Sequence, residues 1–248
     1  MKDRVIVITG ASQGIGAALA QLAASQGALP VLVGRSLSTL EATARTCGSQ
    51  ALAIQADCTR RVDVEHAVQE VLARRGRIDV WVNNVGRGIT RLPSQLTDED
   101  LDDMMRINVK SAWYGVQAVL PHFKERGRGQ IVNVSSMLGR VPFAVPRSAY
   151  NGAKHFLNAL TANLREELKE SHPEILMTLV SPGVVRTNFG LNALHGGADS
   201  RSFPESQSAE EVAAVIARAI EMGRTDVYTR SGAKARVAGY FSQIGEDA

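Results

Sequence analysis

The sequence predicts a single α/β domain in which a doubly wound, mainly parallel sheet of seven strands carries helices on both faces. Three observations lead to this fold class. Short β-branched runs alternate with helical segments along the chain, which is typical of parallel strands joined by helical crossovers. The first strand ends in a glycine-rich turn that opens a helix. The first 185 residues contain no linker rich in Pro, Ser or Gly, so residues 1–248 are expected to form one domain.

The elements are predicted in order from local signals. Residues 4–9 form a β-branched run that ends at Gly10, as expected of a strand buried on both faces. A helix over 17–26 has Gly27 as its C-terminal cap. Thr97 and the three acids after it begin a helix that runs to about residue 126 and that Pro121 is expected to kink. The remaining strands are predicted over 30–34, 50–56, 79–82, 130–134, 175–180 and 226–229, and the remaining helices over 37–47, 62–75, 150–168 and 209–222.

Composition excludes several classes of protein. Hydrophobic content of 44%, charged content of 21% and a net charge of +3 are typical of a soluble globular protein. No apolar run reaches about 18 residues and the N-terminus lacks a signal-peptide pattern, so a cytoplasmic protein without a membrane anchor is expected. Two isolated cysteines argue against a metal site or a disulfide scaffold. The short arginine clusters lack interleaved aromatic residues, so no nucleic-acid partner is expected.

A glycine-rich turn follows the first strand. Gly10, Gly14 and Gly16 have the spacing Gly-x-x-x-Gly-x-Gly, a variant of the commoner Gly-x-Gly-x-x-Gly. Glycines let the backbone approach a pyrophosphate, and a helix N-terminus favours an anion. Because this turn leaves a predicted strand and opens a predicted helix, it indicates a dinucleotide site.

The end of the second strand bears on the choice of dinucleotide. An NAD site usually has a carboxylate there for the ribose 2′-hydroxyl, whereas an Arg suits a 2′-phosphate. This chain has Gly34-Arg35-Ser36 and no acid. We therefore expect NADP(H) rather than NAD(H). The alternative is that Arg35 stacks on the adenine of either dinucleotide.

Tyr150 and Lys154 are four residues apart in a helical segment. Such side chains share one helix face, with Cβ atoms about 5–6 Å apart. At ~5 Å and an effective dielectric constant of ~20, one positive charge is worth roughly 3 kcal/mol, or about two pKa units. Lys154 is therefore expected to lower the pKa of Tyr150 and make it an acid–base group. The alternative is a surface Tyr beside a surface Lys.

Taken together, these residues resemble the short-chain dehydrogenase/reductase family. The resemblance reaches about residue 187 and implies a Rossmann-type fold, an NAD(P)-dependent oxidoreductase and a homo-tetramer or homo-dimer formed through two long helices. Aromatic residues that would serve such a contact, or equally the core, are Trp113, Tyr114, Phe123 and Phe156. The motifs that carry the resemblance are Thr9-Gly10-x-x-x-Gly14-x-Gly16, Asn83-Asn84-Val85-Gly86, Asn108, Ser135-Ser136, Tyr150-x-x-x-Lys154 and Pro182-Gly183-x-x-x-Thr187.

The resemblance also implies residue roles. Tyr150 would be the acid–base residue, Lys154 would lower its pKa and bind the nicotinamide ribose, and Ser136 would bind the substrate carbonyl. Asn108 would position a water in a proton relay to Lys154; the alternative is a polar residue on the solvent side of its helix. Asp57 and the backbone of Cys58 would contact the adenine, and Thr187 would hold the carboxamide. The implied cofactor-binding set is Gly10, Ser12, Gln13, Gly14, Ile15, Gly16, Arg35, Ser36, Asp57, Cys58, Asn84, Gly86, Tyr150, Lys154, Pro182, Gly183, Val185 and Thr187.

Two positions depart from the family pattern. Val85 stands where the family usually has Ala. Ser136 precedes Tyr150 by 14 residues rather than 13, and a bulged loop over 142–146 is expected to absorb the extra residue. If it does not, Ser135 competes with Ser136 for the substrate carbonyl. The other long irregular stretch, 188–208, is expected to be a functional lid or a disordered segment.

Three functions are compatible with the sequence. The first is an NADP(H)-dependent oxidoreductase that transfers a hydride between the nicotinamide and a ketone or secondary alcohol. The second is an NAD-dependent alcohol dehydrogenase of the same family. The third is a non-enzymatic dinucleotide-binding regulatory protein, against which the intact set of Asn108, Ser136, Tyr150 and Lys154 argues. The sequence does not specify the small-molecule substrate.

Overall fold

In the computed structural model, which describes residues 1–245, seven strands form one sheet. Their order is β3-β2-β1-β4-β5-β6-β7, and every neighbouring pair is parallel. The predicted α/β fold with a doubly wound parallel sheet is thus confirmed. The strands are β1 (Val5–Thr9), β2 (Leu29–Gly34), β3 (Leu52–Gln55), β4 (Val80–Asn83), β5 (Gly129–Val134), β6 (Ile175–Ser181) and β7 (Asp226–Tyr228).

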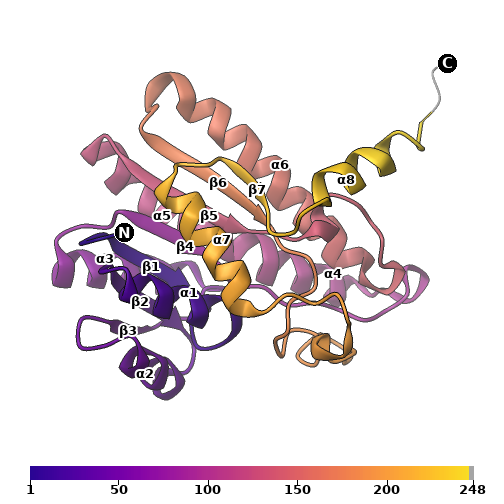
Figure 1. Cartoon of the computed structure of the whole chain (residues 1–248), viewed down its shortest axis with the longest axis horizontal. Coiled ribbons are helices and arrows are strands. Elements are labelled where there is room, and N and C mark those ends of the chain that lie inside the picture. Colours follow the sequence, from indigo (N-terminus) through magenta and orange to yellow (C-terminus); the bar gives the residue numbers. More distant parts are fainter. Residues whose placement is uncertain (246–248) are drawn as a thin grey trace.

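Helices cover both faces of the sheet (Figure 1). One face packs against α1 (Gly14–Ser25), α2 (Leu37–Thr46) and α7 (Ala209–Glu221). The other packs against α3 (Arg61–Arg75), α5 (Ser111–Arg126) and α6 (Ser148–Ser171). The short α4 (Asp98–Met105) precedes α5, and α8 (Ala233–Phe241) extends away from the body at the C-terminal end of the described chain (Figure 1).

Strand β1 shows why the sheet needs two helical layers. Its side chains alternate between the faces, with Val5 and Val7 in one apolar core and Ile6 and Ile8 in the other. All four are essentially inaccessible to solvent. A strand with apolar side chains on both faces is removed from water only when helices cover both faces of the sheet.

The strand order places a crevice beside β1. The strand pairs with β2 on one side and with β4 on the other, so successive connections run in opposite directions from it. In such sheets ligands bind outside the carboxyl ends of the strands at this switch point. The residues that follow β1, β4, β5 and β6 all belong to motifs identified in the sequence, so the topology brings them to one edge.

The helix predicted from Thr97 to about residue 126 is confirmed, with a π-helical turn inside it. Thr97 caps α4 as expected: the Asp100 amide donates to Thr97 Oγ1 at 3.3 Å, and the Thr97 amide donates to the Asp100 carboxylate at 3.2 Å. A π-helical turn, η2 (Arg106–Lys110), then separates α4 from α5. Pro121 lies inside α5, which nevertheless continues to Arg126. The irregular part of this continuous helix is thus the π-turn, and the expected kink at Pro121 stays a prediction.

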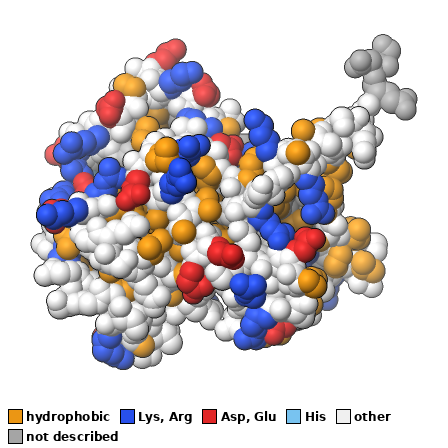
Figure 2. Space-filling view, viewed as in Figure 1, with side chains coloured by type: hydrophobic (Ala, Val, Ile, Leu, Met, Phe, Trp, Pro, Cys, Tyr) orange, Lys and Arg blue, Asp and Glu red, His pale blue; other side chains and the backbone are white. Residues whose placement is uncertain are grey.

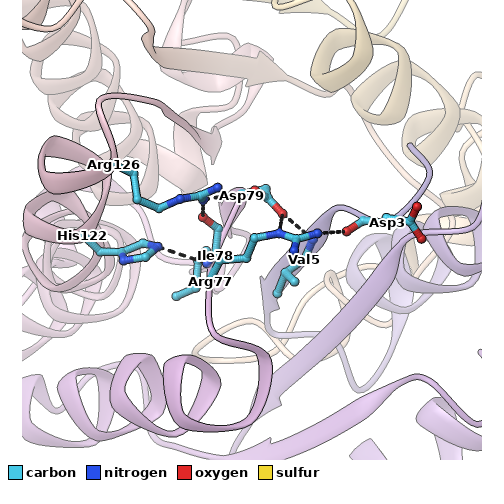
Figure 3. Close-up of polar contacts among 7 residues, drawn as sticks. All are labelled: Asp3, Val5, Arg77, Ile78, Asp79, His122 and Arg126. Carbon is cyan, nitrogen blue, oxygen red and sulfur yellow. Dashed lines mark hydrogen bonds and ion pairs between the residues drawn. The ribbon is translucent and has the colours of Figure 1, made fainter.

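A polar cluster joins β1, β4 and α5 at the amino ends of the strands (Figure 3). The Asp79 carboxylate accepts hydrogen bonds from the Val5 amide at 2.8 Å, Arg77 Nε at 3.0 Å and Arg126 Nη1 at 3.1 Å. The Ile78 amide donates to His122 Nε2 at 3.1 Å, so that nitrogen is unprotonated. These contacts lie opposite the crevice and serve stability.

Charge is dispersed on the face of the molecule that Figure 2 shows, where basic and acidic side chains alternate without a continuous basic stripe. Within residues 1–245 no helix is both long and apolar enough to span a membrane. Over the same range no group of three or more His, Cys, Asp or Glu side chains could hold a metal ion. The stretch 188–208 is irregular as predicted, apart from one 3-10 turn, η5 (Ser200–Ser202).

Candidate active site

The glycine turn and the start of α1 form a cradle of backbone groups. Gly10 and Gly14 have φ values of +65° and +58°, which side chains rarely adopt. A Cβ at Gly16 would lie 2.6 Å from the Gly10 carbonyl oxygen, so only glycine fits there. The N-cap Gln13 makes no side-chain cap and the first turn has no acid. The first amides of α1 are thus free of side-chain acceptors, which fits an anionic group such as a pyrophosphate.

Asn84 fixes this cradle to the end of β4. Its side-chain amide donates to the carbonyl oxygens of Thr9 at 3.0 Å and Gly10 at 3.2 Å. Its backbone amide donates to Thr9 Oγ1 at 3.0 Å. Thr187 closes the other side, since its Cγ2 lies 3.1 Å from the place of a Cβ on Gly14. Motifs more than 100 residues apart therefore meet across the crevice.

A second group of residues lies at the ends of β2 and β3. Gln55 Nε2 donates to the Arg35 carbonyl oxygen at 2.8 Å, and the Asp57 carboxylate accepts from the Thr59 amide and hydroxyl. Burial opposes ionisation of Asp57, but these hydrogen bonds and the charges of Arg35 and Arg106 lower its pKa. Cys58 is buried and its pKa is raised to about 12 by desolvation, so its thiol is inert. Arg35, Asp57 and Cys58 are thus brought together.

Asn108 lies in the π-turn and is completely buried, at 0% exposure. Its Oδ1 accepts from the Arg87 amide at 3.0 Å, and its Nδ2 donates to the carbonyl oxygens of Arg87 at 3.0 Å and Met104 at 3.2 Å. The alternative of a solvent-facing polar residue is wrong. Its side-chain amide holds the backbone that follows β4, next to Gly86, and has no hydrogen bond to Lys154.

Tyr150 and Lys154 lie on the buried face of α6, at 5% and 2% exposure, so the alternative of a surface pair is wrong. Lys154 Nζ lies 5.8 Å from the centre of the Tyr150 ring and donates to the Val134 carbonyl oxygen at 3.0 Å. A Cβ on Gly86 would lie 3.5 Å from the same Nζ. The i,i+4 spacing and the end of β4 together set this arrangement.

Burial dominates the titration of the pair. Desolvation raises the pKa of Tyr150 to about 12, although hydrogen bonding with Ser136 and the charge of Arg147 act to lower it. Desolvation also lowers the pKa of Lys154 to about 8. In the protein without its dinucleotide the pKa of Tyr150 is therefore raised and not lowered as expected, because removing the phenol from water costs more than Ser136 and Arg147 return.

The two serines after β5 have different surroundings. Ser135 Oγ is committed to Asn158 Oδ1 at 2.5 Å, and Asn158 Nδ2 in turn donates to the Gly139 carbonyl oxygen. Ser136 Oγ accepts from the Leu138 amide at 3.1 Å and lies beside Tyr150. Ser136 is therefore the serine at the phenol. Two short 3-10 turns, η3 (Met137–Gly139) and η4 (Val145–Arg147), fill the connection with its extra residue.

Segments after β6 close the site. The Pro182 carbonyl oxygen accepts from the Met137 amide at 2.8 Å, while Gly183 lies against the Arg230 side chain. Val185 forms an isolated parallel bridge with Gln207. The Leu194 amide donates to the Gly88 carbonyl oxygen at 2.9 Å, and the Leu194 carbonyl oxygen accepts from the Thr90 amide at 3.0 Å. The irregular stretch is thus attached to the segment that follows β4.

Several residues outside the motifs are brought to this site by the fold. Phe189 packs edge-on against Tyr150, with ring centres 5.6 Å apart. His195 Nε2 contacts Asp100 at 2.7 Å and has a positive φ of 62°, which is unusual for a residue other than glycine. Arg147 approaches Gly88 and Gly197. None of these follows from a motif, because each depends on where the irregular stretch folds back.

The aromatic residues expected at a subunit contact divide into two kinds. Phe123 is fully buried beside Gly129 in the core of its own chain, so its expected part in a subunit contact is wrong. Trp113 and Tyr114 are half-buried, and Tyr114 carries the Arg61 guanidinium 4.6 Å above its ring. Phe156 on α6 is 50% exposed. The homo-oligomer itself stays a prediction.

Comparison with known proteins agrees with this architecture. The family model for short chain dehydrogenases matches residues 4–195. An uncharacterized oxidoreductase of Staphylococcus saprophyticus is 36% identical over 189 residues, which cover 75% of this chain and 76% of that protein. The chain therefore belongs to the short-chain dehydrogenase/reductase family of oxidoreductases.

Solved structures share the fold over nearly the whole chain. A short-chain dehydrogenase/reductase from Burkholderia phymatum, solved in complex with NAD, has a TM-score of 0.88 at 23% identity and covers 100% of this chain and 97% of its own. An alcohol dehydrogenase from the archaeon Thermococcus sibiricus, solved with 5-hydroxy-NADP, has a TM-score of 0.78 at 25% identity, covering 92% of this chain and 96% of its own.

Proposed function

We propose that this chain uses NADP(H) to interconvert a ketone and a secondary alcohol, with Tyr150 as the acid–base residue. The observation that carries the proposal is the buried Tyr150 phenol, which has the Ser136 hydroxyl beside it and Lys154 Nζ 5.8 Å from its ring. This group lies at the same edge of the sheet as the glycine cradle. A general acid and an anion cradle at one edge suit a reaction of a bound dinucleotide.

The residues present fit a nicotinamide dinucleotide. Gly10, Gly14 and Gly16 would hold its pyrophosphate, the Arg35 and Asp57 group its adenosine end, and Lys154 the ribose next to the nicotinamide. The bound dinucleotide supplies or accepts the hydride. The neighbours from Burkholderia phymatum and Thermococcus sibiricus, solved with NAD and 5-hydroxy-NADP, support this class of cofactor.

The protein contributes acid–base chemistry and orientation. Because burial keeps the pKa of Tyr150 high, the phenol is protonated at neutral pH and can donate to a carbonyl oxygen as that oxygen gains charge. Ser136 provides a second hydroxyl for the same oxygen. Lys154, with its pKa lowered to about 8, retains a positive charge at neutral pH that stabilises the phenolate left after proton transfer.

The preference for NADP(H) rests on Arg35. Its side chain is exposed at the end of β2, where no carboxylate stands to accept a ribose 2′-hydroxyl. Within residues 1–245 no ion pair involves Arg35 at salt-bridge distance, so its guanidinium is available to a 2′-phosphate. A guanidinium can bind a phosphate through two parallel hydrogen bonds, an interaction stronger than stacking on the adenine.

Replacing Tyr150 tests the catalytic assignment. We expect Tyr150→Phe to lose turnover by about 10²–10⁴-fold, the usual contribution of a general acid, while NADPH still binds in a fluorescence titration. Tyr114→Phe is the control: it removes the hydroxyl of a half-buried tyrosine on α5, and this variant should remain active. Near-normal turnover by Tyr150→Phe would remove the assignment, and binding without turnover of any ketone by the wild type would favour a regulatory role.

The cofactor assignment is tested separately. The wild-type protein should show a higher kcat/KM with NADPH than with NADH, and Arg35→Asp should reverse the order because a carboxylate repels a 2′-phosphate. Arg45→Asp at the other end of α2 introduces the same charge away from the crevice and should leave the preference unchanged. A wild-type preference for NADH would establish the NAD-dependent alternative.

A further inference from the structure

Arg147 carries a guanidinium that the proposed chemistry does not use. The residue ends the 3-10 turn η4 (Val145–Arg147) and stands three positions before Tyr150. A Cβ on Gly88 would collide with Arg147 Nη1, and a Cβ on Gly197 would lie 3.1 Å from Nη2. The guanidinium of the half-buried Arg147 therefore lies between the segment that follows β4 and the irregular stretch. Its burial lowers the pKa of Arg147.

The guanidinium lacks a counter-charge. Arg147 Nη1 is buried and has no hydrogen-bond acceptor among the described residues, and no carboxylate in residues 1–245 pairs with Arg147. Nearby Arg91 differs, since it pairs with Asp100 at 2.7 Å. Buried donors normally have partners, and a buried donor of a charged group without an acceptor is costly. A feature this unfavourable in the protein alone is expected where a ligand completes it.

A second unpartnered group lies next to the first. Thr90 Oγ1 is also buried, and no group in residues 1–245 forms a hydrogen bond with it. It lies 3.2 Å from the place of a Cβ on Gly197, the same point that Arg147 Nη2 approaches to 3.1 Å. Arg147 Nη2 and Thr90 Oγ1 thus lie beside the same glycine. A guanidinium fork with a neighbouring hydroxyl matches the oxygens of a carboxylate or phosphate.

These groups lie one aromatic ring away from the proposed acid. Phe189 packs against Tyr150 with ring centres 5.6 Å apart, and its Cε1 lies 3.2 Å from the place of a Cβ on Gly88, where Arg147 Nη1 also falls. The charge of Arg147 acts on Tyr150 as well. A small molecule with its carbonyl at Tyr150 would thus place a group a few bonds away at Arg147, beside an apolar ring.

We propose that Arg147 and Thr90 bind an oxyanion of the substrate, so that the enzyme acts on a keto acid or a phosphorylated ketone rather than on a neutral ketone. This inference rests on the proposed function. Covered by the irregular stretch, the bound anion is shielded from water, which strengthens its interaction with the guanidinium. Arg147 is then a specificity-determining residue and not an acid or base.

Paired substrates test the proposal. NADPH oxidation is followed with 2-, 3- and 4-oxopentanoate, each against its methyl ester, and with dihydroxyacetone phosphate against dihydroxyacetone. The wild type should prefer the anionic member of at least one pair. Arg147→Met should lower kcat/KM for that anion by about 10- to 100-fold, the loss expected for a charge-assisted hydrogen bond, and change the neutral partner little. Arg147→Lys should retain part of the preference.

A matched control removes the same charge elsewhere. Arg128 is exposed in the turn before β5, at the opposite end of the sheet, and Arg128→Met should leave the preference for the anion intact. Thermal melting of each variant checks folding. Equal losses for anion and neutral partner in Arg147→Met would show that the residue only supports the fold and would overturn the proposal, as would a wild type without preference in any pair.

A binding measurement separates this inference from the proposed function. The same anions are titrated calorimetrically into Tyr150→Phe loaded with NADPH, and into the double variant that also carries Arg147→Met. Binding by the first and not by the second supports the anion site whatever the turnover. Anions that bind neither, or both equally, overturn it. Turnover of neutral ketones without any preference for anions would remove this inference and leave the proposed function intact.

Discussion

Replacing Asn108 with Asp tests how the π-turn supports the active-site edge of the sheet. The substitution keeps size and shape but exchanges the Nδ2 donor for an oxygen. That oxygen would face the carbonyl oxygens of Arg87, at 3.0 Å, and Met104, at 3.2 Å. A carboxylate cannot donate to either, so the variant must hold a buried charge against two lone pairs or take up a proton.

The expected loss of stability in Asn108→Asp follows from the burial of the new carboxyl group and from one neighbouring cation. Full burial raises the pKa of a carboxyl group by ~3–5 units. The positive charge of Lys154 opposes this rise in pKa, because it lies close to residue 108. Lys154 Nζ and Asn108 Oδ1 lie 3.5 and 3.1 Å from the place that a Cβ on Gly86 would occupy. At ~6 Å and an effective dielectric constant of ~20 the attraction is roughly 3 kcal/mol, or about two pKa units. The remaining shift of about 2 units destabilises the folded variant by about 3 kcal/mol at pH 8.

Urea unfolding between pH 5 and 8 measures this cost and its sign. The introduced carboxyl has a higher pKa in the folded state than its unfolded value of about 4, so the folded state binds more protons and stability is lost as pH rises. The difference from the wild type should therefore shrink as pH falls from 8 to 5. Turnover should fall as well, since the backbone that follows β4 loses its attachment.

Asn163→Asp is the matched control. Asn163 Nδ2 donates to the Ala159 carbonyl oxygen at 3.0 Å, the same four-residue spacing as between Asn108 and Met104, but on the exposed side of α6. We expect a change within about 0.5 kcal/mol there. Equal costs in the two variants, or a cost at Asn108 that does not vary with pH, would refute the reasoning.

Two further predictions concern the ends of the sheet. Asp79→Asn should lower the free energy of unfolding in urea by about 1–2 kcal/mol. This loss should exceed that of the same change at Asp103, whose side chain is more exposed. Burial raises the pKa of Asp79, but hydrogen bonds and Arg126 lower it further, to below its usual value. The difference should therefore hold at neutral pH, begin to shrink below about pH 4 and disappear only once pH falls through the lowered pKa of the folded state. Gly16→Ala should destabilise the protein by about 1–3 kcal/mol and weaken NADPH binding, because the new Cβ would lie 2.6 Å from a carbonyl oxygen. Gly152 faces open space, so Gly152→Ala should stabilise α6 by ~0.5–1 kcal/mol. Similar melting temperatures for the two variants would contradict this prediction.

The sequence alone determined the elements and the residues that meet at the crevice. Alternation of apolar residues predicts strands buried on both faces, and Thr97 and the glycine turn mark helix starts, because these signals act within a few residues. The positions of Gly10, Asn84 and Tyr150 could be inferred because carboxyl ends of parallel strands gather at one edge. Strand ends were less well predicted, as with β3, where pairing with β2 sets the limits.

Only the tertiary structure decided what surrounds those residues. The π-turn at Asn108 arises where its amide meets Arg87, and the choice between Ser135 and Ser136 depends on Asn158. The raised pKa of Tyr150 reflects burial by several elements, which an i,i+4 estimate in a uniform dielectric does not contain. Arg147 Nη1 is buried without an acceptor among residues 1–245 because the irregular stretch packs against its side chain. Such contacts join residues far apart in the chain, and burial and counter-charge are properties of the packed molecule.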